Sequence, residues 1–145
     1  MTHRILLAAF GAATLAVAAC VPSADQAGAL GDPSEWDVLW IEGQRLPEGT
    51  DATLSLAQGQ IVYRGGCNSF TGLRYDPAAG TIRAEGPLTS TRMACPAAQM
   101  ALDESLGAAL QRVNGLGRAA DRNPGALALL SDGEPVVMIA PRVRQ

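Results

Sequence analysis

The sequence contains no lysine, and its only histidine is His3, near the N-terminus. All eleven basic residues are arginine. Ser-His-Asp and Cys-His catalytic units, histidine metal sites, Schiff bases and Walker nucleotide loops each require one of these two residue types. Beyond His3 the chain can therefore build none of them, and any chemistry would have to use carboxylates, hydroxyls, arginine or cysteine. We expect a protein that is not an enzyme and that uses no metal and no cofactor.

Charged residues are also scarce, at 17% of the sequence, and the formal net charge is −3 at pH 7. A mildly acidic chain is a poor candidate for nonspecific nucleic-acid binding, so we expect no nucleic-acid partner. The neighbouring acids Asp103 and Glu104 fall in a predicted helix, where adjacent residues point about 100° apart. They do not form an acid/base pair, and we expect them on a solvated helix face.

The N-terminus has the pattern of a secretory signal. A short basic region at His3 and Arg4 precedes the largely apolar stretch 5–17, which is too short to cross a bilayer as a mature helix. Val17-Ala18-Ala19-Cys20 then has the form of a bacterial lipobox, so residues 1–19 are predicted to be a lipoprotein signal peptide. Cys20 would become the lipidated N-terminus, and several acyl chains would make a stable membrane anchor. The alternative is ordinary signal cleavage near Ala19.

A spacer follows the predicted anchor. Residues 20–33 are rich in proline, glycine and small polar residues and show no sustained period, which is typical of a flexible tether. Val21, rather than an aspartate, follows Cys20, and this favours the outer membrane. We therefore expect a folded domain over 34–143 that is held at the bacterial cell envelope by its lipid and faces the periplasm.

The folded part contains many short, β-rich segments separated by tight turns. Trp36 and Trp40 lie four residues apart in the first of these segments, so both are predicted to face the core. The pattern predicts an α+β fold with an antiparallel sheet or partly open β-barrel of about 7–8 short strands and one packed helix. The predicted strands are 36–42, 53–56, 61–63, 71–75, 81–84, 117–120, 126–130 and 136–140.

One segment, about 96–113, is predicted to be helical. Proline at position 96 fits the first turn of a helix, because its missing N–H would have no partner there. Asn114-Gly115 supplies a C-terminal stop. Apolar residues recur at helical spacing and form one stripe. The stripe consists of Leu102, Leu106, Ala109, Leu110 and Val113.

Beyond Cys20, the chain has two cysteines, Cys67 in the stretch 65–75 and Cys95 in the stretch 88–96. Two cysteines in one small exported domain most often pair. We therefore predict a structural disulfide between them. Two free thiols or a redox site remain as alternatives, because the sequence does not show whether the two residues come within bridging distance.

The residues around the cysteines favour structural roles. Gly65-Gly66 is interpreted as a bend or bulge between strands, with Asn68 bonding its own backbone in the turn, since no lysine follows to make a phosphate loop. Phe70 and Tyr75 are predicted core residues. In 89–92, hydroxyls are expected to satisfy backbone groups of an irregular segment. The alternative for 89–92 is an anion site at the helix N-terminus.

Together, the two cysteine-containing stretches resemble the META domain family, also described as HslJ-like. The resemblance is best over 66–110 and extends more loosely over 36–143. It implies a small domain made of an antiparallel sheet and a helix, on an envelope or lipid-anchored protein with links to heat shock and novobiocin resistance. It supplies no catalytic residues. The motif residues that carry it, besides the cysteines, are Gly66, Asn68, Phe70, Gly72, Tyr75, Thr91, Met93 and Pro96.

The expected function is a non-enzymatic, lipid-anchored envelope protein. It would act as a binding module that supports envelope stress or drug tolerance, with the membrane and an envelope protein or lipid as partners. One alternative is a pilotin-like carrier of an acyl chain or of a partner's tail, and another is a carboxylate-based enzyme. An apolar cavity would favour the carrier, whereas a polar cleft with converging carboxylates would favour the enzyme.

Overall fold

The computed structural model describes residues 30–31, 34–119 and 125–142. The predicted signal peptide 1–19, the predicted lipid attachment at Cys20 and most of the predicted tether 20–33 lie outside these residues. Residue 143, the last of the predicted domain, also lies outside them. Within the described ranges, no helix combines the length and the apolar character needed to cross a membrane.

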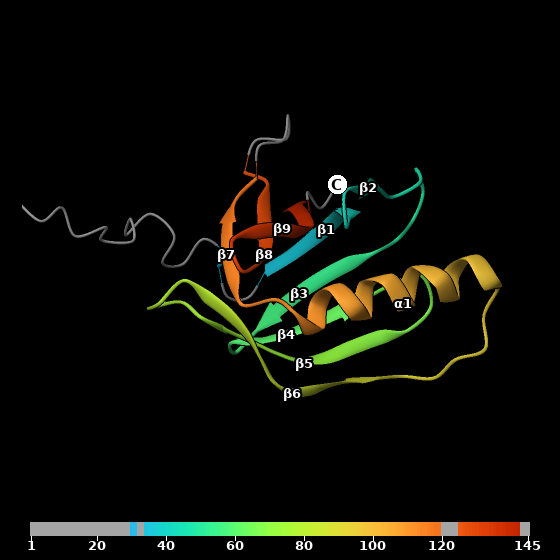
Figure 1. Cartoon of the computed structure of the whole chain (residues 1–145), viewed down its shortest axis with the longest axis horizontal. Helices are drawn as coiled ribbons and strands as arrows, with labels where there is room; N and C mark the ends of the chain where they lie inside the picture. Colours follow the sequence, from blue (N-terminus) through green and yellow to red (C-terminus); the bar gives the residue numbers. More distant parts are fainter. Residues whose placement is uncertain (1–29, 32–33, 120–124, 143–145) are drawn as a thin grey trace, which may run out of the picture.

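The described residues form one antiparallel sheet that curls into a half-barrel, with a single helix, α1, across its open side (Figure 1). The strand order is β6-β5-β4-β3-β1-β9-β8-β7, with β2 beside β1. The predicted α+β class is therefore confirmed. The strands are β1 (Ser34–Ile41), β2 (Gln44–Arg45), β3 (Thr53–Ala57), β4 (Gln60–Arg64), β5 (Ser69–Asp76), β6 (Thr81–Ser90), β7 (Gly115–Arg118), β8 (Leu127–Ser131) and β9 (Glu134–Pro141).

Helix α1 (Ala97–Gln111) buries the predicted apolar stripe against the inner face of the sheet. Leu106, Ala109 and Leu110 have no measurable exposure, and Leu102 packs partly buried at the edge of the same cluster. The helix ends at Gln111, two residues before the predicted end. The Asn114 N–H donates to the Leu130 carbonyl at 2.9 Å, so the chain leaves the helix to start the β7–β8 pairing.

The core lies between the helix and the curled sheet. Strands β3 and β4 show why the core forms on the inner face of the sheet. Their residues alternate between buried and more exposed positions. Each strand contributes its apolar set to the inner face. The largest fully buried side chains there include Leu54, Leu56, Ile61 and Tyr63.

The prediction that both tryptophans face the core was wrong for one of them. Trp36 is buried, whereas Trp40 is only half-buried and lies outside the core cluster. The register against β9 shifts between Val38 and Trp40, so Leu39 is an extra residue in β1. Such a β-bulge resets the alternation of faces, and the core position passes from residue 40 to Ile41.

Strand β6 is longer than the predicted 81–84 and runs on to Ser90, so Thr89 and Ser90 are not irregular as expected. Its pairing with β5 is interrupted, because Leu73 pairs with Ala84 but Thr71 pairs with Thr89. The intervening residues 85–88 bulge out of the ladder. Strand β7 also begins two residues earlier than predicted, and the two-residue β2 was not predicted.

Candidate functional site

The Gly65-Gly66 pair, which follows β4, allows helix α1 to lie directly on the β4–β5 turn. A Cβ atom at Gly65 would overlap the Asp103 Oδ1 atom, and one at Gly66 would come within 3.2 Å of the Gln99 backbone. A helix can approach a turn this closely only where side chains are absent. The two glycines therefore do more than bend the chain, since they make room for the helix.

Asp103 points from α1 into this turn and is 4% exposed. Its Oδ2 atom accepts hydrogen bonds from the Asn68 backbone N–H at 2.8 Å and from Asn68 Nδ2 at 2.9 Å. Its Oδ1 atom accepts the Cys67 N–H at 3.3 Å. The prediction of a solvated face was therefore wrong for Asp103. The turn presents buried N–H groups that need an acceptor, and a carboxylate supplies two oxygens for them.

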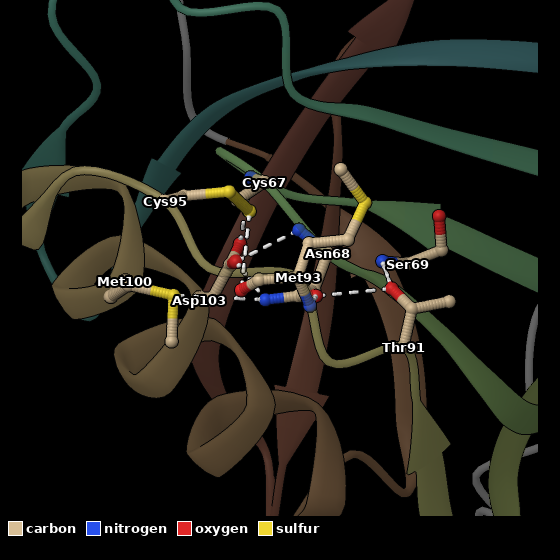
Figure 2. Close-up of a disulfide and its surroundings, with 8 residues drawn as sticks. All are labelled: Cys67, Asn68, Ser69, Thr91, Met93, Cys95, Met100 and Asp103. Carbon is tan, nitrogen blue, oxygen red and sulfur yellow. Dashed lines mark hydrogen bonds between the residues drawn. A yellow bond between two sulfur atoms is a disulfide. The ribbon is translucent and has the colours of Figure 1, made fainter.

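Asn68 is 5% exposed and lies between α1 and the segment that follows β6 (Figure 2). Its Oδ1 atom accepts the Met93 N–H at 2.8 Å and the Thr91 hydroxyl at 3.1 Å. The Thr91 oxygen in turn accepts the Ser69 N–H at 3.0 Å. The prediction that the Asn68 side chain bonds its own backbone was therefore wrong. The side chain instead joins the helix to the 91–95 segment. The Thr91 hydroxyl does satisfy a backbone group.

The disulfide between Cys67 and Cys95 ties the β4–β5 turn covalently to the 91–95 segment. Their Cα atoms are 6.3 Å apart, across 28 positions of sequence. Pro96 directly precedes the first helical residue, so the crosslink lies at the entry to α1. We refer to the residues that meet here as the Asn68 hub. The hub consists of Cys67, Asn68, Thr91, Cys95 and Asp103.

The other motif residues divide between the hub and the sheet. Gly66, Met93 and Pro96 adjoin the hub. Tyr75 is buried in β5, as predicted. Gly72 has a φ of 113°, and a Cβ there would lie 3.4 Å from Leu88, so it serves the bulge between β5 and β6.

Tyr63 is a buried polar group that sequence reasoning did not single out. Its hydroxyl has no hydrogen-bond partner among the described residues. Burial, followed by the negative charge of Asp103, raises the pKa of the Tyr63 hydroxyl far above its ordinary value. The phenol therefore remains neutral, and its ring packs in the core near Phe70, with ring centroids 6.3 Å apart.

Beside the hub, a groove of about 860 Å³ opens between α1 and the end of β6. Phe70 is half-buried, and a Cβ atom at Gly107 of α1 would come within 3.0 Å of its ring. Met93 and Met100, which are 57% and 41% exposed, line the groove. We call it the α1–β6 groove. Its lining residues are Asn68, Phe70, Ser90, Thr91, Arg92, Met93, Ala94, Ala97, Met100, Ala101, Asp103, Glu104, Gly107 and Ala108.

The polar groups of the α1–β6 groove do not converge on a reacting centre. Both Asp103 oxygens accept hydrogen bonds from the β4–β5 turn. Arg92 and Glu104 make no ion pair with another residue in the described ranges. The same part of the chain holds no group of three or more histidine, cysteine, aspartate or glutamate residues that could bind a metal. The arrangement suits the binding of an apolar group flanked by charge.

The comparisons with known proteins agree with this fold. The model of the META domain family matches residues 29–142. Among curated proteins, none matches the chain significantly. Among solved structures, the NMR structure of a protein from Burkholderia xenovorans is similar, with a TM-score of 0.63 and 21% identity, over 94% of this chain and 100% of that chain. At this identity the likeness shows the fold alone.

Proposed function

Because this chain belongs to the META domain family, whose members are associated with the bacterial envelope, we propose that it is a non-enzymatic, lipid-anchored envelope protein. It binds another envelope component through the α1–β6 groove and in this way supports envelope stress or drug tolerance. The lipid at Cys20 holds the domain at the outer membrane, where it faces the periplasm.

The observation that carries this proposal is the apolar groove beside the Asn68 hub. Large side chains with much of their apolar surface in water mark interaction sites when they gather in a concave patch. Met93 and Met100 lie on opposite walls, one on the 91–95 segment and one on α1. Methionine side chains are flexible and polarizable, so they adapt to different apolar ligands.

The chemistry of the groove supports binding over catalysis. The chain beyond His3 offers neither histidine nor lysine. Asp103 is engaged by three N–H donors of its own chain, and Glu104 is solvent-exposed on the adjacent position of the helix. A pilotin-like carrier of an acyl chain or a partner's tail remains the second candidate, because about half of the groove's lining residues carry apolar side chains.

Filling the groove is expected to weaken partner binding in cells. Ala108 is exposed and lines the α1–β6 groove, so Ala108→Trp places an indole in it. The chain lacks lysine for amine-reactive crosslinkers, so a photoreactive benzoylphenylalanine in place of Met93 serves as the reporter. We expect a discrete crosslinked adduct in intact cells, and a roughly tenfold or greater loss of it with Ala108→Trp, the equivalent of about 1.4 kcal/mol.

The matched control is Ala98→Trp. Ala98 is an exposed alanine of the same helix but lines a different hollow, beside Pro47 and Asp51. It should leave the adduct unchanged. An adduct that survives Ala108→Trp, or that is lost equally with Ala98→Trp, contradicts the proposed site.

Lipid anchoring makes a separate prediction. Cys20→Ser should move the protein from the membrane fraction to the soluble fraction, or leave unprocessed precursor, because the acylated thiol is lost. Val21→Asp keeps the acylated cysteine and should shift the protein toward the inner membrane. Fractionation followed by immunoblotting measures both. If the Cys20→Ser protein fractionates like the wild type, the anchor lies elsewhere.

A further inference from the structure

The outer edge of β6 is open where it enters the α1–β6 groove. Ser90 is directly opposite Phe70, and the next residue's N–H, that of Thr91, donates to the Ser69 carbonyl at 3.1 Å. This bond pattern marks Phe70 and Ser90 as a non-hydrogen-bonded pair of the antiparallel ladder. The N–H and C=O of Ser90 therefore point away from β5. Because β6 ends the strand order, no other strand of the described residues is hydrogen-bonded to this edge.

Two residues earlier on the same edge, around Leu88, the backbone groups of β6 already have a hydrogen-bond partner. The partner is the side-chain amide of Gln111. The Leu88 N–H donates to Gln111 Oε1 at 3.0 Å, and Gln111 Nε2 donates to the Gly86 carbonyl at 3.2 Å. An amide that accepts and donates in this way supplies what a peptide group supplies. The protection stops at Leu88, and among the described residues Ser90 has no comparable partner on its outer side.

The charges of the groove favour a peptide over an acyl chain. Arg92 lies on the 91–95 segment and Glu104 on α1, and neither makes an ion pair within the described part of the chain. An extended peptide offers backbone groups to Ser90 and side chains of either charge to these two residues. An acyl chain offers neither hydrogen bonds nor charge. The open backbone groups at Ser90 and the two unpaired charges therefore favour a peptide as the ligand.

On the basis of the proposed function, we propose that the occupant of the α1–β6 groove is an extended peptide segment of a partner envelope protein, which pairs with β6 at Ser90 as an additional strand. The residue opposite Ser90 shares its face of the sheet. Phe70 occupies that face, so the peptide places an apolar side chain over Phe70 and an acidic residue near Arg92. Strand addition of this kind derives affinity from the backbone and specificity from alternate side chains.

The test uses the lipidated full-length protein in nanodiscs and a library of displayed linear seven-residue peptides. We expect enrichment of peptides with alternating apolar residues and one acidic residue. Ser90→Pro removes the outward N–H, which takes no part in the ladder with β5, together with the hydroxyl, and proline is tolerated at such an edge position. It should weaken the selected peptides about tenfold, the effect of one lost hydrogen bond. Ser90→Ala keeps the N–H and should change affinity less than about twofold.

A second comparison leaves the protein unchanged, so it holds even if Ser90→Pro disturbs folding. N-methylation of the selected peptide at the residue opposite Ser90 should cost about tenfold in affinity for the wild-type protein. Failure to enrich any peptide, or equal binding of the methylated and unmethylated peptides, overturns the strand inference. Lysophosphatidylcholine, which carries one acyl chain, tests the lipid alternative. If it binds the groove while peptides do not, the strand inference fails but the proposed function stands; if the in-cell adduct is also absent, both fail.

Discussion

Replacement of Asp103 by alanine is expected to lower the free energy of unfolding by about 3–5 kcal/mol. The substitution leaves three N–H groups without their acceptor, namely the Cys67 N–H, the Asn68 N–H and the Asn68 amide. The site is buried, so water does not readily replace the carboxylate. Small domains are stable by only about 5–15 kcal/mol in total, so the loss threatens folding itself.

Urea denaturation followed by circular dichroism measures this effect. The matched control is Glu104→Ala on the next residue of the helix, which is exposed and should change stability by less than about 0.5 kcal/mol. Asp103→Asn should also destabilise, because its NH₂ group would face N–H donors. Equal stability of the Asp103→Ala and Glu104→Ala proteins would show that the Asn68 hub does not hold the helix.

Gly65 provides an independent check through a double-mutant cycle. Gly65→Ala alone should cost about 1–3 kcal/mol, because its Cβ overlaps the Asp103 carboxylate. In the Asp103→Ala background the overlap is gone, so the cost should fall by about 1 kcal/mol or more. Additive costs would mean that the glycine serves the backbone bend rather than the close approach of α1.

The second large effect is expected from the disulfide. The double change Cys67→Ser with Cys95→Ser removes a crosslink between residues 28 positions apart. In the chain-entropy account this lowers the free energy of unfolding by about 3.5 kcal/mol. The hydrogen bonds of Asn68 to Thr91 and Met93 do not involve the sulfurs, so the fold should persist with a lower melting temperature.

Two measurements separate this prediction from its alternatives. Thiol labelling of the native, unreduced protein should modify neither Cys67 nor Cys95, and reduced wild-type protein should melt like the double variant. Hydrogen exchange at the Met93 N–H should quicken in the double variant, because this amide lies on the segment that the crosslink holds. Quantitative alkylation without reductant, or an unchanged melting temperature, would mean that the two thiols are free in solution.

The sequence by itself determined the class of this protein. Alternating apolar residues between turns determined the strands, and a stripe at helical spacing determined a helix over 96–113, of which Ala97–Gln111 forms. These signals are local, because each depends on the periodicity of one element. The same holds for the two motif stretches, whose residue order alone sufficed to identify the family.

Tertiary structure alone decided which face each element shows to which neighbour. Asp103 looks like a solvated residue in its own helix, and its partners lie 35 and 36 positions away in a turn whose N–H groups need an acceptor. Trp40 lies outside the core because Leu39 is an extra residue against β9. This bulge depends on how β1 pairs with β9, and the order of apolar residues within β1 does not reveal it. The α1–β6 groove likewise exists only once the helix has docked on Gly65 and Gly66, and the edge at Ser90 is open because β6 ends the strand order. Periodicity defines a face within one segment, but what covers that face depends on contacts between segments far apart in the chain.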